Sequence, residues 1–323
     1  MALDVLYTNG VIAVREKNLL KDKLLRLCEL SAKEAFRMLL ESGFGGAEAA
    51  TDVYEYEKLI AVEEDKLDAF ILEYAPSKGE AEYLLSPRDF HNAKALIKAK
   101  YLGESADKML APEGLITIER LRTCVQDNDF SPLAEYPLLQ EACLQASELL
   151  ETEPSGAKTG DIFQKALYAH LFKSVKNKGA LKKILVAKSD MINILTAVRS
   201  GEREIAFNKY LPTGKLSAKE LDALFDEDKE RAVSAFKNTP YYDFVKLCLD
   251  AKERGLPLTE AEKILGGYDT AYFSARKHEL KRSEPFLYYV YRRKAECANV
   301  RVIFVCLLAG LSEQDIKRRL RAF

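Results

Sequence analysis

An acid and an asparagine three residues apart occur three times in this chain, at nearly equal intervals. The pairs are Asp89 with Asn92 in DFHNAK, Asp190 with Asn193 in DMINIL, and Glu296 with Asn299 in ECANVR. At 323 residues the chain exceeds the usual size of one hydrophobic core, so units of about 100 residues are the natural expectation. We therefore predict three similar units, with boundaries at 1–114, 115–213 and 214–323.

The apolar residues favour helices along the whole sequence. Between residues 23 and 43, apolar side chains such as Leu24, Leu27 and Leu30 recur every three or four positions, which places them on one helix face. Strand-like alternation is scarce, so the predicted fold class is all-α. Further helices are expected over 56–74, 86–101, 117–125, 134–151, 161–176, 180–200, 217–225, 229–237, 240–253, 259–265, 269–280, 284–309 and 312–321. Clusters of Gly, Pro and Ser, such as PTGK and GGYD, predict the breaks between them.

A short helix with a hydroxyl N-cap is expected after each acid–asparagine pair. The predicted caps are Thr117, Ser217 and Ser312. Ser217 with Glu220 has the spacing of a capping box, and Ser31 with Glu34 repeats it near the N-terminus. An extra half unit at the opposite end predicts units that close into a ring, with the chain beginning in mid-unit. Closure requires residues 24–40 to pack against residues 311–320.

Helix capping alone does not explain the three pairs. Residues three apart share a helix face, and Asp89 fits a helix start in which Ser86 is the N-cap and Pro87 the first helical residue. Glu296, however, lies deep inside a predicted helix, where no free N–H groups remain. A buried polar group without a partner costs roughly 1 to 3 kcal/mol. We therefore expect each acid and amide to hydrogen-bond a neighbouring helix or loop within its unit, as a structural rather than a catalytic feature.

Basic side chains near the pairs are candidate partners. Lys94 and Arg301 follow their asparagines by two residues, and Lys98 and Arg199 follow theirs by six. The predicted structural motif consists of Asp89, Asn92, Lys98, Asp190, Asn193, Arg199, Glu296, Asn299 and Arg301.

The sequence carries no catalytic, cofactor-binding or metal-binding signature. It contains no phosphate-binding loop, dinucleotide fingerprint, nucleophile elbow or H-E-x-x-H motif. His91, His170 and His278 fall in different predicted units, which argues against a metal site. We expect no catalytic residue, no cofactor and no metal.

Charge and composition limit the classes of partner and the cellular compartment that we expect. Lys plus Arg (49) nearly balance Asp plus Glu (50), so no overall field attracts nucleic acid. Six cysteines without a C-x-x-C pair indicate a reducing, cytoplasmic setting, and the N-terminus lacks the pattern of a signal peptide. The most apolar segment, VIFVCLLAGL at 302–311, is about half the length of a membrane-spanning helix, so we predict a buried helix and no membrane span.

Three segments carry a family resemblance. YLLSPRDFHNAKALIKAKYLG, KSDMINILTAVRS and EPFLYYVYRRKAECANVRVIFVCLLAGLSEQDIKRRL, each leading to a capped short helix, resemble the C subunit of prokaryotic V-type (A-type) ATPases, the family of the eukaryotic subunit d. The agreement runs the length of the chain. It is clearest from Asp89 to Lys98 and from Tyr291 to Arg301, although Glu296 stands where the other copies have Asp.

The resemblance implies a fold and a role. The expected fold has three similar helical domains around a pseudo-threefold axis, forming a funnel, with the acid–asparagine helices in its repeated core. The expected role is a non-catalytic adaptor between the rotor shaft subunits of the D and F type and the membrane proteolipid ring. Such a protein would be peripheral on the cytoplasmic face, present in one copy per complex, and monomeric when isolated.

Two other classes of function remain open from the residues. A soluble helical-repeat scaffold would use the same repeats as an open array that presents a concave surface to unrelated partners. A helical enzyme would need a pocket with clustered, pKa-shifted acids, which this sequence does not indicate.

Overall fold

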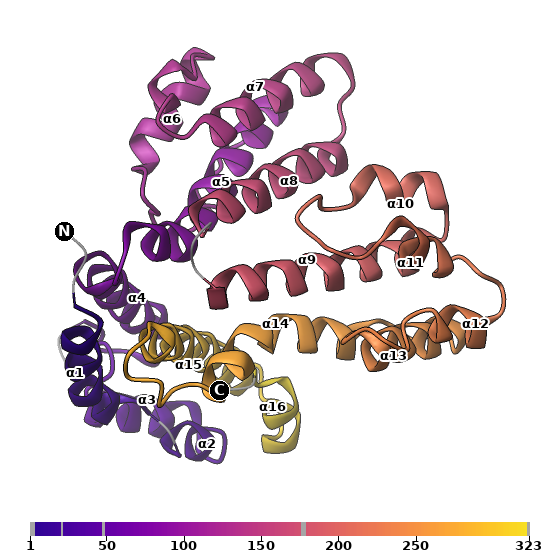
Figure 1. The fold of residues 1–323 in the computed structure, drawn as a ribbon. Coiled ribbons are helices and arrows are strands. Elements are labelled where there is room, and N and C mark those ends of the chain that lie inside the picture. The colour runs from indigo at the N-terminus through magenta and orange to yellow at the C-terminus, as the bar shows by residue number, and fades with distance from the viewer. Residues whose placement is uncertain (1–3, 21, 47–48, 176–178, 322–323) are drawn as a thin grey trace. The chain divides into compact units, whose positions relative to one another are not determined.

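The computed structural model describes residues 4–20, 22–46, 49–175 and 179–321. Over these ranges the chain is helical with no strand, which confirms the all-α prediction (Figure 1). The helices are α1 (Val5–Arg15), η1 (Glu16–Asn18), α2 (Lys23–Leu27), α3 (Ala32–Glu41), η2 (Val53–Glu55), α4 (Tyr56–Tyr74), α5 (Lys78–Leu102), α6 (Ile118–Asp127), η3 (Ser131–Leu133), α7 (Pro137–Thr152), α8 (Gly156–Ser174), α9 (Gly179–Ser200), α10 (Arg203–Lys209), α11 (Ala218–Ala223), α12 (Lys229–Ser234), α13 (Tyr242–Glu253), α14 (Thr259–Ser274), α15 (Glu284–Leu308) and α16 (Glu313–Arg319). They form two compact units: unit 1 comprises residues 1–81 and 266–323, and unit 2 comprises residues 82–265.

In unit 1, helices from the two ends of the chain share one core. Leu24 and Leu39 of the N-terminal helices α2 and α3 lie in the same buried cluster as Phe304 of α15 and Ile316 of α16. Leu311 and Leu320 pack against this cluster. The expected packing of residues 24–40 against residues 311–320 is therefore confirmed. Each large apolar side chain buried in this way stabilises the fold by about 1.5 to 3 kcal/mol.

Helix α4 runs along α15 and completes unit 1. Phe70 of α4 packs against Phe286 and Tyr289 of α15, with ring centroids 5.6 and 5.1 Å apart. The segment predicted as a buried apolar helix forms the end of α15 as far as Leu308. Its Ile303, Phe304 and Cys306 side chains are buried, but Val305 and Leu308 are exposed, so the segment is amphipathic rather than buried on all sides. Within the described ranges, no helix combines the length and apolar character needed to cross a bilayer.

Unit 2 is built on helices α5 and α9. A buried cluster joins Phe90 and Ile97 of α5 to Leu121 of α6 and Leu139 of α7. Helix α7 packs against α8, and α9 packs against α10 and α13. Because α9 contacts neighbours on several sides, its buried residues include Leu181, Ile184, Leu185, Met191, Ile194, Leu195 and Val198.

The helix ends follow local chemistry that the sequence predicts. Ser31 and Ser217 form capping boxes with Glu34 and Glu220, and Thr117 and Ser312 accept N–H groups as N-caps, all as predicted. Helices α5, α9 and α15, which carry the acid–asparagine pairs, are each followed by a left-handed glycine: Gly103, Gly201 and Gly310, with φ of 68°, 65° and 72°. Only glycine adopts this conformation without a steric penalty, so the three helices end in the same way.

Some helices differ from the prediction. Helices α1 and α10 were not predicted, and α14 continues through Gly266, where the GGYD segment was expected to end a helix. Helix α5 begins at Lys78, so Pro87 lies inside it and Ser86 is not its N-cap. The Ser86 hydroxyl instead hydrogen-bonds the Glu82 carbonyl one turn earlier. A helix interior tolerates proline only when tertiary packing offsets a penalty of about 3 kcal/mol.

Candidate functional site

In the first copy of the motif, Asp89 and Asn92 project from α5 and hold the loop that follows it. The Asp89 carboxylate, 1% exposed, accepts the Leu115 N–H at 3.0 and 3.1 Å and the Ile116 N–H at 3.1 Å. The Asn92 amide donates to the Ala111 carbonyl at 3.1 Å, while its oxygen accepts the Ala111 N–H at 2.8 Å. Together the two side chains fix the path of the chain as it enters α6.

The second copy repeats this arrangement on α9. Asp190 accepts the Lys215 and Leu216 N–H groups at 2.6 and 2.9 Å. Asn193 makes the same two-way contact with one residue, since its oxygen accepts the Leu211 N–H at 2.7 Å and its nitrogen donates to the Leu211 carbonyl at 3.1 Å. The Tyr241 hydroxyl adds a hydrogen bond of 2.8 Å to Asp190, which links this copy to the start of α13 as well.

A glycine lies directly before the loop donors in both of these copies. A Cβ added to Gly114 would lie 2.4 Å from Oδ1 of Asp89, and one added to Gly214 would lie 2.5 Å from Oδ1 of Asp190. Both distances are shorter than nonbonded atoms tolerate, so the glycines are required for the close approach of each carboxylate. Both glycines were visible in the sequence, but the reason for them was not.

The third copy draws on both ends of unit 1. Asn299 of α15 makes the two-way contact with Arg321, accepting its N–H at 2.8 Å and donating to its carbonyl at 3.1 Å. A backbone donor to Glu296, however, is the Leu20 N–H at 2.9 Å, from the N-terminal segment. Asn18 lies two residues before this donor, where the other copies have a glycine two residues before their second donor. Glutamate is one methylene longer than aspartate, which suits a loop that carries a side chain there.

Glu296 also belongs to a buried ion-pair cluster. Arg293, one turn earlier on α15, donates to Glu296 at 2.8 Å and to Glu63 of α4. Glu63 in turn accepts the Gly45 N–H at 2.9 Å and the Lys66 ammonium at 2.8 Å. Burial alone would raise the pKa of Glu63, but Arg293 and the other donors outweigh it and lower that pKa. Glu63 and Arg293 are 230 residues apart, so no local signal in the sequence revealed the pair.

The carboxyl of Asp89 has a raised pKa. Burial raises the pKa of its carboxyl from 3.8 to about 6, although the Leu115 and Ile116 N–H groups oppose that shift. Its backbone donors are fixed and uncharged, so they compensate the lost hydration less fully than a buried cation would. Asp89 therefore carries an electrostatic cost at neutral pH in return for holding the loop.

The basic residues expected to pair with the motif acids have other partners. Lys98 donates to the Gly156 carbonyl at 2.6 Å, Arg199 pairs with Glu262, and Arg301 pairs with Glu57 at 3.0 Å. Lys94 is half-buried, and its pKa is lowered by that burial and by nearby Lys98. An arginine does pair with Glu296, but it is Arg293, which the sequence reasoning did not select.

His91 and His170 have different contact partners. His91 contacts the Met109 carbonyl at 2.8 Å, and His170 packs against the Phe90 ring with centroids 5.4 Å apart. Among the described residues, no group of three or more His, Cys, Asp or Glu side chains is placed to hold a metal ion.

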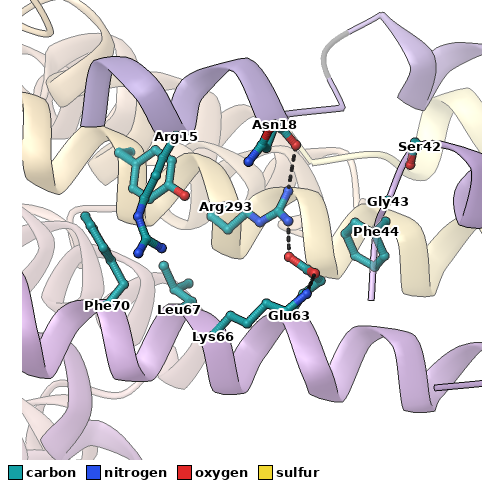
Figure 2. A pocket seen from close by; sticks show the side chains of 11 residues that line it. Arg15, Asn18, Ser42, Gly43, Phe44, Glu63, Lys66, Leu67, Phe70 and Arg293 are labelled. Atoms are coloured by element: carbon teal, nitrogen blue, oxygen red, sulfur yellow. Dashed lines mark hydrogen bonds and ion pairs between the residues drawn. The ribbon is translucent and has the colours of Figure 1, made fainter. Parts of the chain in front are cut away.

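A cavity of about 260 Å³ adjoins the ion-pair cluster in unit 1. Its lining comes from α1, η1, α4, α15 and the segment after α3, as Figure 2 shows. Arg15, Lys66 and Arg293 bring positive charge to it, while Phe44 and Phe70 supply apolar walls. The motif helices thus do two things: they fix loops through backbone hydrogen bonds, and α15 also forms part of a cationic cavity.

The sequence is similar to that of a known protein family over nearly the whole chain. The sequence matches the model of the ATP synthase (C/AC39) subunit family over residues 8–319. The V-type ATP synthase subunits C of two strains of Thermus thermophilus are each 28% identical to it over 305 residues, which cover 87% of this chain and 93% of each relative. A match that extends through all three copies of the motif covers the chain as a whole rather than one segment, and the chain belongs to the ATP synthase (C/AC39) subunit family.

Proposed function

We propose that this protein is the non-catalytic central-stalk adaptor of a prokaryotic V/A-type ATPase. It would couple the D- and F-type shaft subunits to the membrane proteolipid ring during ATP-linked proton or sodium transport. The observation that carries this proposal is the family match over residues 8–319. The hydrogen bonding of the motif supports it, since the acids of all three copies accept backbone N–H groups and thereby fix loops to helices.

The mechanical demand of such a coupler fits this construction. One elementary charge crossing about 150 mV is worth roughly 3.5 kcal/mol, and several ions act together. A single exposed salt bridge contributes only about 0.2 to 1 kcal/mol, so isolated surface contacts would slip under that load. Where a loop is hydrogen-bonded to both the acid and the asparagine of a helix, few flexible connections remain within the repeat. A coupler of this kind transmits torque through stiff helices and wide contact surfaces.

The arrangement of the repeats is part of the same proposal. We infer that the three copies lie around a pseudo-threefold axis in a funnel-shaped molecule, with repeats near 1–114, 115–213 and 214–323. The support is the recurrence of one hydrogen-bond pattern on α5, α9 and α15. Spin labels placed on α5, α9 and α15 would give three similar interhelix distances, whereas an open helical array would give one distance much longer than the other two.

The location and stoichiometry follow from the role. The protein would lie on the cytoplasmic face of the membrane as a peripheral subunit, with one copy per complex and a monomeric isolated form. Neither nucleic acid nor a membrane span of its own has a part in this role.

A pull-down from native membranes tests the proposal. The chain, carrying an affinity tag and expressed in its host, should recover the shaft subunits and the proteolipid after mild detergent extraction. The matched negative control is the same chain expressed without the tag, which should recover neither the shaft subunits nor the proteolipid. Purification of the folded wild-type chain with neither the shaft nor the proteolipid would refute the adaptor role.

A further inference from the structure

The cavity in unit 1 has more positive than negative charge around it. The positive charges of Arg293 and Lys66 are balanced by two negative charges. One is on Glu63, which lines the cavity, and the other is on Glu296, which pairs with Arg293. Arg15 is then left as an additional cation in the lining. A net charge of one in a partly enclosed space is attractive to an anion, because the surrounding protein screens it less than water would.

Arg15 is held facing this space without an acidic partner among the described residues. Its guanidinium lies 4.8 Å from the centre of the Phe70 ring and 5.6 Å from that of Tyr74. Figure 2 shows the side chain reaching from the end of α1 across to Phe70 and Leu67. A guanidinium that contacts a ring through its face keeps its N–H groups, which point outward in the plane of the guanidinium, available to an acceptor.

The side chains that line the cavity indicate the size and polarity of the rest of the ligand. Phe44, Leu67, Phe70 and Tyr289 are each at least nine-tenths buried and give the cavity an apolar side. The volume of about 260 Å³ lies just below the usual range for drug-sized ligands, so only a small group fits. An inorganic anion would leave the apolar walls without contacts, whereas an acid on a small aromatic or aliphatic stem would use both surfaces.

We propose that this cavity is a binding site for a small monocarboxylate with an apolar stem, and that Arg15 pairs with its carboxylate. The planar fork of arginine matches a carboxylate through two parallel hydrogen bonds. The carboxylate can belong to a free small molecule or to an acidic side chain or chain terminus of a bound protein. Both sources share the same chemistry, and the site does not depend on the adaptor role.

Binding of 4-fluorobenzoate to the isolated full-length chain tests the site. Its fluorine resonance should broaden and shift with saturation on the order of 1 mM, as expected for a ligand of this size. Neutral 4-fluorobenzamide, which has the same shape, should bind about tenfold more weakly or not at all. Failure of the wild-type chain to bind 4-fluorobenzoate, or equal binding of the two compounds, would overturn the proposal.

Variants of Arg15 separate charge from packing. Arg15→Met keeps an apolar side chain over Phe70 and should weaken 4-fluorobenzoate binding about 10- to 100-fold, whereas Arg15→Lys should fall between it and the wild type. The matched control is Arg276→Met, which removes another ring-stacked arginine of unit 1, lying 3.9 Å from the Tyr272 centroid and outside the cavity. That control should bind like the wild type. Unchanged binding in a folded Arg15→Met variant would rule out the assigned role of Arg15.

The assembled ATPase distinguishes the two sources of the carboxylate. If a protein partner supplies it, the probe should bind the isolated chain but not the complex, and Arg15→Met should weaken assembly. If a free molecule supplies it, the probe should bind both forms, and assembly should be unaffected by Arg15→Met. The binding measurement on the isolated chain stands whether or not the chain proves to be the stalk adaptor.

Discussion

Replacing Gly114 by alanine should uncouple α5 from the loop that it holds. The new Cβ would lie 2.4 Å from Oδ1, 2.7 Å from Cγ and 2.8 Å from Oδ2 of Asp89, so the whole carboxylate must move. Movement would break its bonds to the Leu115 and Ile116 N–H groups while the carboxylate remains buried. Hydrogen bonds to charged groups contribute about 1.5 to 3 kcal/mol each, so we expect a loss of about 3 to 5 kcal/mol in the free energy of unfolding.

Urea unfolding followed by circular dichroism measures the loss, and hydrogen exchange locates it. The Leu115 and Ile116 amides should lose protection far more than amides in α7. Gly160→Ala is the matched control, because a Cβ there meets nothing within 4 Å inside α8 and should be neutral or stabilise by about 0.5 to 1 kcal/mol.

A double-mutant cycle gives the decisive comparison. In an Asp89→Ala background the carboxylate is gone, so adding Gly114→Ala should cost less than about 0.5 kcal/mol. An equal cost in both backgrounds would show that the clash with Asp89 is not the cause, and the reasoning about the glycine would be wrong.

Three further changes test the buried polar groups. Because the folded pKa of Asp89, about 6, lies above the value of 3.8 for an exposed aspartate, its contribution to stability is complete below pH 4 and is lost as the pH rises through 6. Asp89→Asn should therefore remove a decline of up to about 3 kcal/mol between pH 4 and 7 in urea unfolding, and an unchanged pH profile would contradict the assignment. Asn299→Ala should cost about 1 to 2 kcal/mol and expose the Arg321 amide to hydrogen exchange; full protection of that amide in the variant would refute the tether. Arg293→Met should cost about 3 to 5 kcal/mol, since it removes the buried cation shared by Glu63 and Glu296. The cost of Arg301→Met, whose side chain is 41% exposed, should be less than about 1 kcal/mol; similar costs by thermal unfolding would count against the cluster.

The sequence predicts the long helices well because their signals are local. Helix α4 has the predicted bounds, 56–74, and α9 and α15 agree with their predictions to within a residue at each end. Apolar spacing defines the buried face, and hydroxyl caps and glycines mark the ends.

Helix α1 was missed because its buried face is partly polar. Thr8 and Asn9 are buried, and they hydrogen-bond the carbonyls of Tyr74 and Leu280. A polar side chain that hydrogen-bonds a distant carbonyl can lie in the core. In the sequence, however, it interrupts the regular spacing of apolar residues that indicates a helix. Such a helix is specified by tertiary contacts that no local pattern contains.

The partners of the acid–asparagine pairs differ from the prediction in two respects. They were expected within each predicted unit, but Glu296, of the predicted unit 214–323, accepts from Leu20, of the predicted unit 1–114. Hydrogen bonds to a neighbouring loop were expected for the acid–asparagine pairs, but basic side chains were expected to take part. The structure uses backbone N–H groups for Asp89 and Asp190, and the glycines that admit them precede the donors by one residue. For Glu296 a backbone donor is Leu20, which is 276 residues away in the sequence, and no local pattern indicates a contact over that separation.

The shared core of the two chain ends has a consequence for biosynthesis. The N-terminal segment of unit 1 leaves the ribosome long before α15 is made, and at about 5 to 20 residues per second the delay is roughly 10 to 40 s. During that interval the apolar faces of α2, α3 and α4 lack the α15 and α16 side chains that they pack against in the folded protein, while all of unit 2 is translated. The nascent chain must therefore keep its first segment from aggregating until its last one arrives, and a premature stop before α15 would release a polypeptide that chaperones and proteases recognise as incomplete.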